Sequence, residues 1–491
     1  MNDNDLVRRS VAALRARLLV VAPSVGVAAG RANQLAVGPL LEALADAVAG
    51  SSTPSRVWLL ATAVAAGYPT VAEVTAVTRG LELAAPGVRG GAVLSGVAVT
   101  ASQVRSSVVS IELVSDPLVD VDFCATHAHN TGIQRVVRST VPKWSGAHVL
   151  AAWSPDGTGY RRLTPSQESL VTAWHSGARA EPADTNAEPL LVPVDGAILL
   201  PEVPALEYIA RLASIARFSG NRVGLIGYDA IPVVSADTVS DDESDRFAHY
   251  LEVVKHANVV SCISETTADE FRSLNSSFEA QGIRGPSVLA LPLPEQPVGG
   301  QRAAEHAAPV AVPLVLMVGS LEPRKNQLGV LSASRILWER GAEFELQFIG
   351  GGSAWFIAQF DREVDAVRRL GYPVSVRRGV SDSDLAAAYR AATVFVFPSL
   401  QEGYGLPIVE ALATGTPVIT SNYGSMAEIA QGGGCLSVDP RDDDAIADAI
   451  ERLLVDPVLR ESLIAEAAAR QGLTWAEYAG SLWRQFMEPV A

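Results

Sequence analysis

The sequence predicts an α/β protein built on parallel sheets, and three observations carry this prediction. Residues 393–422, TVFVFPSLQEGYGLPIVEALATGTPVITSN, contain an apolar strand, a glycine-containing loop, a short helix and a second apolar strand. That order is a βαβ unit. Residues 314–340 repeat the strand, loop and helix. Of the 491 residues, 48% are hydrophobic and 19% are charged, as in a globular chain with room for roughly three domains.

The loop and helix of the first unit have the features of an anion site. Pro407 stands at the start of the helix and Gly415 just beyond its end, which are the positions that these residues favour. Gly403 and Gly405 leave the loop free to bring backbone N–H groups close to a ligand. The N-terminus of the helix adds partial positive charge, so we expect an anion there.

Two carboxylates lie on either side of that positive end, Glu402 before the loop and Glu410 within the helix. A carboxylate that faced a phosphate would be destabilising, because like charges repel at close range. We therefore expect both carboxylates to bind hydroxyl groups beside the phosphate. A ligand with a phosphate group between two sets of hydroxyl groups is a nucleotide sugar, in which the phosphates link a ribose to a second sugar.

This stretch resembles the donor site of the retaining family 4 glycosyltransferases, in which seven residues separate two Glu residues. PSL before the first Glu, GYGLP between them and EALATGTPVI after the second complete the resemblance. It covers about residues 110–488 and implies the GT-B fold, two Rossmann-like domains facing across a cleft. The implied segments are a Rossmann-like acceptor domain at 106–295, a Rossmann-like nucleotide-sugar donor domain at 310–470 and a helix returning to the first domain at 471–491. Composition adds a linker at 294–309 and, outside the resemblance, a helical N-terminal extension at 1–105.

The second strand–loop–helix unit ends its strand in GSLEPRKN and is a second candidate anion site. Arg324 and Lys325 can supply two positive charges to a diphosphate through charge-assisted hydrogen bonds. The family often has an arginine directly after the glycine, where this chain has Ser320. The resemblance therefore assigns the cationic role to Arg324 and Lys325. The alternative is a solvated basic pair.

The resemblance also implies the other roles in the donor site. Glu410 would hold the ribose hydroxyls, and Glu402 a hydroxyl of the transferred sugar. The nucleobase would lie near Gly379 and Val380. Backbone amides would contact the sugar or the diphosphate at four consecutive residues, Gly403, Tyr404, Gly405 and Leu406. We expect no metal and no cofactor, only a nucleoside-diphosphate sugar as donor.

In the first half, HAHNTGIQRVVRSTVPKW resembles the glycine loop and first helix of the acceptor domain, with Gly132 at a tight turn. Arg135 and Arg138 are either helix-surface residues or contacts to an anionic acceptor. GYDAIPV resembles the family's HD-x-x-P segment, with Tyr228 in place of a histidine that lies near the sugar. Tyr228 and Asp229 are therefore candidates to contact the sugar or the acceptor hydroxyl, Asp229 in a catalytic role.

Two short patterns imitate metal sites. His127 and His129 have no third ligand near them in sequence, so we interpret the pair as incidental. Asp120 and Asp122 lie in a predicted strand at 118–124, which favours structural placement. The cysteines show no metal-ligand spacing and are expected to be separate reduced thiols: Cys124, Cys262 and Cys435.

The first 105 residues are predicted to be helical. One helix face carries Val7, Val11, Leu14 and Leu18 among arginines, which fits either a basic amphipathic helix on an anionic membrane or an ordinary helix with a charged side. No apolar run reaches the ~20 residues of a membrane span. The net charge of −16 argues against nucleic acid as a partner. We predict a cytoplasmic protein, with peripheral contact at the inner face of a membrane as the alternative for the helix.

The predicted function is that of a retaining hexosyltransferase, which needs no metal and moves a hexose from a nucleoside-diphosphate sugar to a glycan or lipid-linked acceptor. The wording EPRKN resembles mannosyltransferases that use GDP-mannose. Two alternatives stay open: a GT-B sugar epimerase or phosphorylase, and a non-catalytic nucleotide-sugar-binding subunit of a glycosylation complex. The sequence leaves the base, the sugar, the acceptor and the oligomeric state open.

Overall fold

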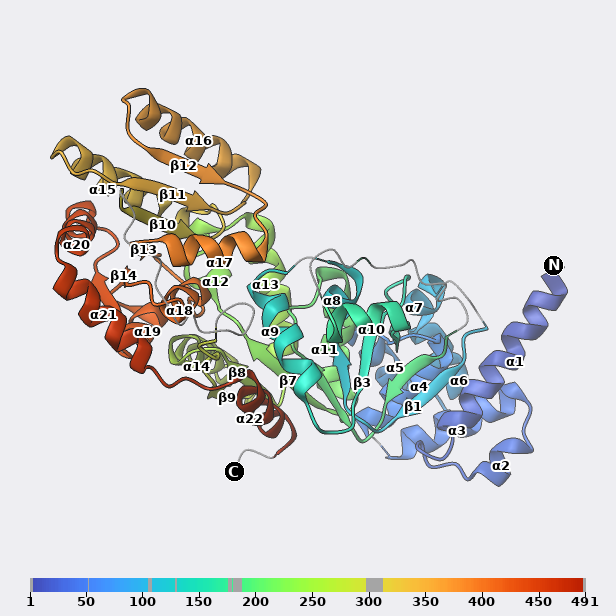
Figure 1. Cartoon of the computed structure of the whole chain (residues 1–491). Helices are drawn as coiled ribbons and strands as arrows, with labels where there is room; N and C mark the ends of the chain where they lie inside the picture. The colour runs from blue at the N-terminus through green and yellow to red at the C-terminus, as the bar shows by residue number, and fades with distance from the viewer. Residues whose placement is uncertain are drawn as a thin grey trace.

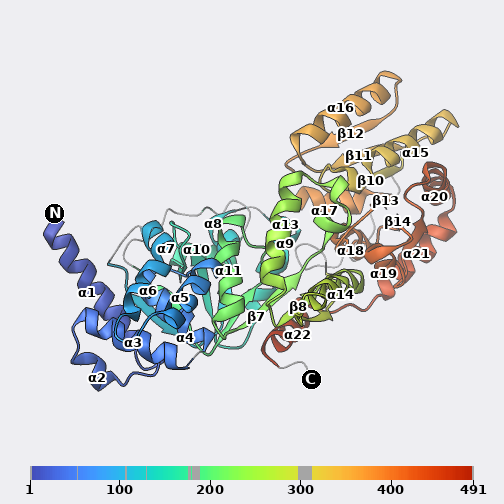
Figure 2. The same cartoon turned by 180° about the vertical axis from the view of Figure 1, so that it is seen from behind.

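The computed structural model describes residues 3–488 apart from residues 52, 105–107, 129, 175–178, 180–187 and 297–311. The strands in these residues form two separate sheets, one of nine strands and one of six. Helices flank both sheets, and the N-terminal helices lie at the far end of the first sheet from the second (Figure 1). The view from behind shows the same arrangement (Figure 2). The α/β class predicted from the sequence is confirmed.

The second sheet is entirely parallel. Its strand order is β12 (Val374–Arg377), β11 (Glu345–Ile349), β10 (Leu314–Val318), β13 (Val394–Phe397), β14 (Val418–Ser421) and β15 (Cys435–Val438). Numbered from β10 this is 3-2-1-4-5-6, the doubly wound Rossmann order. The order reverses between β10 and β13, and ligands bind where the strand order of such a sheet reverses. The two predicted anion loops follow these two strands.

Helices cover both faces of this sheet, which explains why its strands are almost continuously apolar. The helix N-termini beside the site belong to α15 and α18. The helices are α15 (Gln327–Glu339), α16 (Ala354–Arg369), α17 (Asp382–Ala391), α18 (Leu406–Ala413), α19 (Gly424–Ala430), α20 (Asp443–Val455) and α21 (Pro457–Ala469).

The first sheet is mixed, because β4 pairs antiparallel with both of its neighbours. Its order is β1 (Ile111–Val114), β5 (Leu190–Pro193), β4 (Tyr160–Arg162), β3 (Val149–Trp153), β2 (Leu118–Asp120), β6 (Ala197–Leu200), β7 (Arg222–Gly227), β8 (Val259–Cys262) and β9 (Ser287–Ala290). Its helices are α8 (Asp122–Thr126), α9 (Gly132–Thr140), α10 (Pro165–Thr172), α11 (Leu206–Phe218), α12 (Ile231–Val234), α13 (Asp241–Val254) and α14 (Glu265–Glu279).

The predicted strand at 118–124 is too long. It ends at Asp120 as β2, and the next residues form the short helix α8. The physical reason lies outside the segment: the carboxylate of Glu202, which follows β6, accepts the N–H groups of Phe123 at 2.8 Å and Cys124 at 2.9 Å. A carboxylate at this position caps the start of a helix.

Asp120 and Asp122 have structural roles, as expected. Asp120 Oδ2 accepts the Tyr160 hydroxyl at 2.7 Å and Trp153 Nε1 at 3.2 Å. Asp122 Oδ1 accepts the Trp153 backbone N–H at 2.9 Å. These bonds fasten the end of β2 and the start of α8 to β3 and β4.

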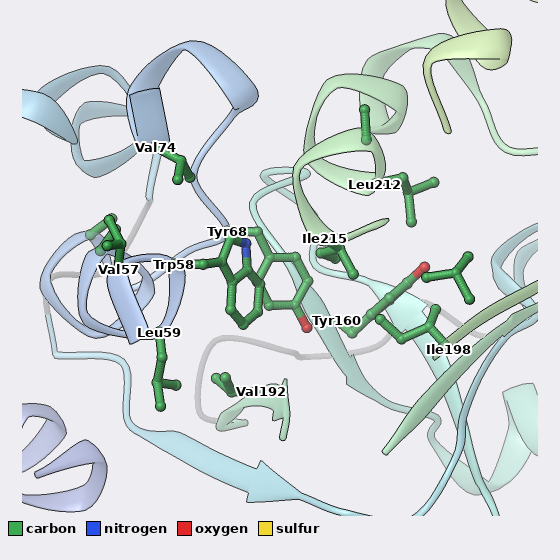
Figure 3. Packing of buried hydrophobic residues seen from close by; sticks show 14 of the residues in the cluster. Val57, Trp58, Leu59, Tyr68, Val74, Tyr160, Val192, Ile198, Leu212 and Ile215 are labelled. Atoms are coloured by element: carbon green, nitrogen blue, oxygen red, sulfur yellow. The ribbon is translucent and has the colours of Figure 1, made fainter. Parts of the chain in front are cut away.

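The N-terminal helices are α1 (Asp3–Val21), α2 (Ala29–Asn33), α3 (Val37–Ser51), α4 (Pro54–Ala65), α5 (Val71–Leu83), α6 (Arg89–Gly96) and α7 (Ala98–Gln103). They share one hydrophobic core with the first sheet. Trp58 and Tyr68 lie beside Tyr160 of β4 (Figure 3), with 5.8 Å between the ring centroids of Tyr68 and Tyr160. The hydroxyl of Tyr68 donates to the Leu191 carbonyl in β5. The helices are therefore part of the packing of this sheet.

The final helix, α22 (Trp475–Met487), leaves the second sheet and packs on the first (Figure 1). Its Phe486 ring lies against Gly224 of β7, where a Cβ atom would come within 2.7 Å of Phe486 Cδ1. Ser261 of β8 donates to Gln485 Oε1 at 2.6 Å. This helix is one of the ties between the two halves. The linker predicted at 294–309 falls mostly outside the described residues, and we keep the four-segment division as a proposal.

Candidate active site

The two sheets face each other across a cleft of about 920 Å³. Loops after β10, β11 and β13 line one side, and the loop before α9 and the loop after β7 line the other. The structure brings together all of the site residues named from the sequence. These are Gly132, Tyr228, Asp229, Ser320, Arg324, Lys325, Gly379, Val380, Glu402, Gly403, Tyr404, Gly405, Leu406 and Glu410.

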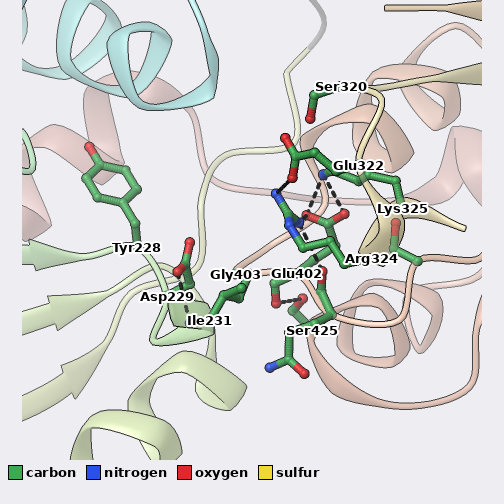
Figure 4. Close-up of polar contacts among 12 residues, drawn as sticks. Tyr228, Asp229, Ile231, Ser320, Glu322, Arg324, Lys325, Glu402, Gly403 and Ser425 are labelled. Atoms are coloured by element: carbon green, nitrogen blue, oxygen red, sulfur yellow. Dashed lines mark hydrogen bonds and ion pairs between the residues drawn. The ribbon is translucent and has the colours of Figure 1, made fainter. Parts of the chain in front are cut away.

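Glu402, between β13 and α18, is buried between two cations (Figure 4). Lys325 Nζ lies 2.5 and 2.7 Å from its two oxygens, and Arg324 Nη1 lies 3.0 Å from Oε2. Burial alone would raise the pKa of Glu402, but Lys325 and Arg324 outweigh burial and lower it. Glu402 is therefore held ionised.

The cations expected to serve a diphosphate are thus already engaged. Arg324 also reaches Glu322, with 2.8 Å between Nη2 and Oε2. Two carboxylates and two cations cancel, so this cluster carries no net charge. The Leu400 N–H donates to the Arg324 carbonyl at 2.7 Å, which joins the loop after β10 to the loop after β13. The cluster is an ion-paired part of the cleft lining rather than a pair of free positive charges.

The N-terminus of α18 offers unengaged donors. No other described residue accepts a hydrogen bond from the backbone N–H groups of Gly403, Tyr404, Gly405 or Leu406. Gly405 caps the helix at φ +123°, a conformation that favours glycine. These four amides line the cleft at the positive end of the helix, where an anion or a polar oxygen is favoured.

Gly403 has a further reason to be glycine. A Cβ atom there would lie 2.0 Å from the carbonyl oxygen of Tyr228, which follows β7 of the first sheet. The Gly403 carbonyl accepts the Ser264 hydroxyl at 2.7 Å and the Thr267 hydroxyl at 3.0 Å. Gly403 therefore allows the donor loop to touch the other half of the molecule. Gly132 differs, because its Cβ would meet only Leu406, at 3.5 Å.

Glu410, in α18, is bound from both halves. Its Oε2 accepts the Tyr389 hydroxyl at 2.9 Å, and its Oε1 lies 2.5 Å from Arg135 Nη1 of α9. Arg135 Nη2 also lies 3.6 Å from Asp382 Oδ1. Burial raises the pKa of Glu410, and the charge of Arg135 partly opposes this. Arg135 thus crosses the cleft to the carboxylate expected to hold a ribose.

The two arginines of α9 have different roles. Arg135 lines the cleft, so the surface interpretation does not hold for it. Arg138 donates to the backbone carbonyls of Leu170 at 3.0 Å and His127 at 2.8 Å, and it supports the loop before the helix. The sequence gives no local signal that separates the two, because the partner of Arg135 lies 275 residues away.

Tyr228 and Asp229 point in different directions (Figure 4). The Tyr228 hydroxyl donates to the Pro201 carbonyl at 2.7 Å, the residue is 7% exposed, and burial raises its pKa well above the ordinary value. Its hydroxyl is therefore already used. Asp229 lines the cleft, and burial raises its pKa against the opposing charge of Arg324. Asp229 is the polar group of this segment that remains for a ligand.

Glu270, in α14, was not found from the sequence. Its Oε2 accepts the Ala230 N–H at 3.0 Å, and its Oε1 accepts Gln401 Nε2 at 2.6 Å. It therefore joins the segment of Asp229 to the donor loop. Burial raises the pKa of Glu270 to about 7, and the charge of Asp229 adds to the increase.

Glycines form the opposite end of the cleft. Gly379 is in the left-handed region at φ +63°, beside the half-buried Val380. A Cβ on Gly350 would lie 1.8 Å from the Gly319 carbonyl, so the loops after β10 and β11 lie in contact. Ser320 lies between them, and its carbonyl accepts Gln327 Nε2 at 2.7 Å. Gly350, Ser320, Gly379 and Val380 bring no charged side chain to this part of the cleft.

The described residues contain no group of three or more His, Cys, Asp or Glu side chains able to hold a metal ion. His127 stacks on Phe123 with ring centroids 4.3 Å apart, and its predicted partner His129 lies outside the described residues. The cysteines are free thiols, as expected, and burial raises the pKa of each: Cys124, Cys262 and Cys435.

A Rossmann sheet facing a second, largely parallel sheet across a shared cleft is the GT-B architecture that the sequence predicted. Comparison with known families agrees: residues 301–470 match the family described as glycosyl transferases group 1.

Among curated proteins, the chain is similar to the serotype-specific mannosyltransferase WbdA of Escherichia coli, with 26% identity over 334 residues that cover 64% of this chain and 38% of the relative. It is 37% identical over 161 residues to the O-antigen chain mannosyltransferase B of Escherichia coli, covering 32% of this chain and 40% of the relative. The chain therefore spans about two fifths of the length of these relatives.

Among solved structures, sucrose-phosphate synthase from Thermosynechococcus elongatus aligns with a TM-score of 0.52 and 18% identity, over 76% of this chain and 99% of that one. At this identity the likeness concerns the fold alone.

Proposed function

We propose that this protein is a retaining hexosyltransferase, which moves a hexose from a nucleoside-diphosphate sugar to a glycan or lipid-linked acceptor. The observation that carries the proposal is the cleft itself. It joins the ionised Glu402, the free amides of α18 and the doubly bound Glu410 within one volume of about 920 Å³. The names of two relatives and the EPRKN wording favour mannose as the hexose.

In this proposal the diphosphate lies at the N-terminus of α18, where the amides of residues 403–406 donate to it. Glu410 accepts hydrogen bonds from the ribose, and Glu402 from a hydroxyl of the hexose. Arg324 and Lys325 keep Glu402 ionised and direct their remaining N–H groups to the phosphates. When the ribose binds Glu410, the ion pair between Arg135 and Glu410 breaks. Arg135 then lies beside the diphosphate as a third cation, with Arg324 and Lys325.

The transfer forms a bond between the acceptor oxygen and the anomeric carbon of the hexose. The bond from that carbon to the β-phosphate oxygen breaks, and the proton of the acceptor hydroxyl passes to the departing diphosphate. Attack on the same face retains the configuration. Preorganised amides and cations stabilise the charge that builds on the diphosphate, so we propose that neither a divalent cation nor another cofactor is required.

Two measurements test the proposal on the purified protein. A thermal-shift panel of UDP-, GDP- and dTDP-sugars should give one donor that raises the melting temperature, because a ligand that binds only the folded state stabilises it. With that donor, a mannose-containing acceptor should release the nucleoside diphosphate, and EDTA should leave the rate unchanged. Inversion at the anomeric carbon, or a rate restored by one metal only, would contradict the mechanism.

A nucleotide-sugar-binding subunit without turnover is the second candidate. Tyr228 favours this non-catalytic function. It replaces the histidine that the family has near the sugar, and its own hydroxyl is already bound to the Pro201 carbonyl. The two candidates differ in one result. A binder would show the thermal shift with the donor but would release no nucleoside diphosphate when acceptor is added.

We also propose peripheral contact with an anionic membrane through the first half of α1. Val7 and Val11 are 61% and 45% exposed on this helix, and Arg8 and Arg9 are exposed beside them. None of the helices in the described ranges has the length and apolar character to cross a bilayer. The wild type should sediment with phosphatidylserine vesicles and a Val7→Asp, Val11→Asp variant should not. Equal sedimentation of the two would exclude this contact.

A further inference from the structure

A second cavity, of about 420 Å³, opens beside the donor cleft. It shares a wall with the cleft, formed by Ile133, Tyr228, Asp229, Glu322 and Arg324. The first half of the molecule supplies α12, α13 and the loop between them. The second half supplies the start of α16, with Ser353 and Trp355. A molecule in this cavity would reach the donor cleft at Asp229.

The floor of this cavity is apolar but contains two buried donors without acceptors. Ile231, Phe247 and Phe271 are buried along it. The Tyr250 hydroxyl, on a residue that is 2% exposed, and Arg246 Nε have no hydrogen-bond partner among the described residues. A buried donor left unsatisfied costs about 1–3 kcal/mol. The cavity is therefore suited to an occupant that brings oxygen atoms as well as apolar surface.

The charges of the cavity argue against an anionic occupant. Both arginines are already paired: Arg246 Nη2 lies 2.5 Å from Glu243 Oε2, and Arg324 Nη2 lies 2.8 Å from Glu322 Oε2. With Asp229 the lining has three acidic and two basic side chains. A phosphate normally requires a free cation or charge-assisted hydrogen bonds. Glu243 balances the charge of Arg246, whose buried Nε–H is left to donate, and in the proposed complex the remaining N–H groups of Arg324 are directed to the diphosphate of the donor.

The second half contributes an aromatic side chain to the cavity, Trp355. Trp355 is 58% exposed at the start of α16 and lines the same cavity as Phe247 and Tyr250. An exposed indole can cover the apolar face of a ligand while its rim stays in water. Since Trp355 belongs to the donor half, the cavity is complete only when the two halves face each other.

We propose that this cavity binds the uncharged saccharide end of the acceptor, and that Trp355 completes it from the donor half. The proposal rests on the proposed transferase function and specifies its acceptor. Sugar hydroxyls accept hydrogen bonds from Tyr250 and Arg246, and the C–H faces of the ring lie against Phe247 and Trp355. A hydrocarbon chain would leave both donors unsatisfied, and a phosphorylated sugar or cyclitol would find no free cation.

The test compares acceptors and variants by kinetics, with the donor found in the thermal-shift panel. Methyl α-mannoside and mannobiose are the uncharged acceptors, and inositol phosphate is the anionic one. Tyr250→Phe and Trp355→Ala should each raise KM for the uncharged acceptor about tenfold, the effect of losing one hydrogen bond or stacking contact. The thermal shift given by the donor should stay as in the wild type.

Matched controls separate the cavity from general effects of the substitutions. Leu370→Ala removes an exposed apolar side chain just beyond the other end of α16, and Tyr372→Phe removes a hydroxyl outside the cavity. Both should keep the wild-type KM. An unchanged KM in Tyr250→Phe and Trp355→Ala, or inositol phosphate as the better acceptor, would overturn the assignment.

Failure of the transferase proposal gives a different result. If the wild type transfers no hexose from any donor, saturation-transfer NMR with mannobiose alone tests the cavity directly. A signal that disappears in Trp355→Ala and persists in Leu370→Ala supports saccharide binding there. No signal in the wild type, or a signal equal in all variants, overturns it.

Discussion

At the scale of single residues, the site depends on a balance of buried charges. Glu402 is held by Lys325 at 2.5 Å and by Arg324 at 3.0 Å, while Glu322 occupies the other side of Arg324. A buried ion pair contributes little net stability, but removing one partner leaves an uncompensated charge that costs about 3–5 kcal/mol. The cluster fixes the position of the Glu402 carboxylate. In return, the charges of Lys325 and Arg324 are balanced by carboxylates.

We expect Glu402→Gln to reduce kcat by about 100-fold or more, because it removes a preorganised group that our proposal places beside the reacting sugar. The amide still accepts a hydrogen bond from Lys325, so the fold should persist. Lys325→Ala is the harsher change and should lower the free energy of unfolding by about 3–5 kcal/mol. Steady-state kinetics and urea unfolding separate the two effects. A near-normal rate in folded Glu402→Gln would remove this residue from the mechanism.

A buried carboxyl that does not line the cleft sets a pH dependence. Burial raises the pKa of Glu202 to about 8, and the charge of Asp120 adds to the increase. The folded state therefore binds more protons than the unfolded chain between the ordinary pKa and about pH 8, so stability is greatest at the acid end and falls as pH rises. One such group contributes a slope of at most about 1.4 kcal/mol per pH unit.

Glu202→Gln should flatten this slope without abolishing it, because burial also raises the pKa of Asp120 and Glu270, each to about 7. Urea unfolding at several pH values between about 5 and 8 measures the change. Glu343→Gln, an exposed carboxyl, is the control and should keep the wild-type slope. A steeper slope in Glu202→Gln would show that the sign of the effect is wrong.

At the scale of elements, the loop before α18 has two functions. Its amides face the cleft, and its Gly403 touches the backbone of the other half at Tyr228. The glycine pattern predicted the first function from the freedom of the loop. The contact with the other half requires residues 228 and 403, which are far apart in the sequence, to come close together. A local sequence pattern cannot predict such a contact.

Gly403→Ala should separate the halves locally, because the new methyl group would lie 2.0 Å from the Tyr228 carbonyl oxygen. We expect activity to fall at least tenfold and the melting temperature to fall by several degrees, the scale of an overpacked contact costing about 1–3 kcal/mol. Gly132→Ala is the matched control, since its methyl would meet Leu406 at an ordinary 3.5 Å. Equal behaviour of the two variants would refute the contact.

At the scale of the whole molecule, the N-terminal helices and the first sheet share one core. Trp58 packs on Tyr68 with ring centroids 5.7 Å apart, and the backbone carbonyl of Tyr68 accepts Arg211 Nη1 from α11 at 2.7 Å. Arg17 of α1 donates to Val109, just before β1, at 2.9 Å. The helices therefore support the sheet that forms one wall of the cleft.

Trp58→Ala should destabilise the protein by about 3–5 kcal/mol, the cost of truncating a large buried aromatic side chain. Tyr68→Phe, which removes only the hydrogen bond to Leu191, should cost about 1 kcal/mol. If the core is shared, circular dichroism and tryptophan fluorescence should show the helices and the sheet unfolding in one transition. A separate early transition of the helices would contradict the shared core.

The sequence determined the α/β class and the strand β10 at its observed bounds, because both depend on short-range patterns such as apolar runs and helix-end residues. The residues named for the cleft came from the two loop patterns and, for Gly132, Tyr228, Asp229, Gly379 and Val380, from the resemblance to the glycosyltransferases. Tertiary structure alone decided that Arg135 meets Glu410, that the Tyr228 hydroxyl turns to Pro201 and that Arg324 and Lys325 are paired with Glu402. It also ended β2 at Asp120, because Glu202 caps the next helix from a distant segment. The reason is the same throughout: a residue type fixes the charge and hydrogen bonds a side chain can offer, whereas the partner it meets depends on how distant segments pack.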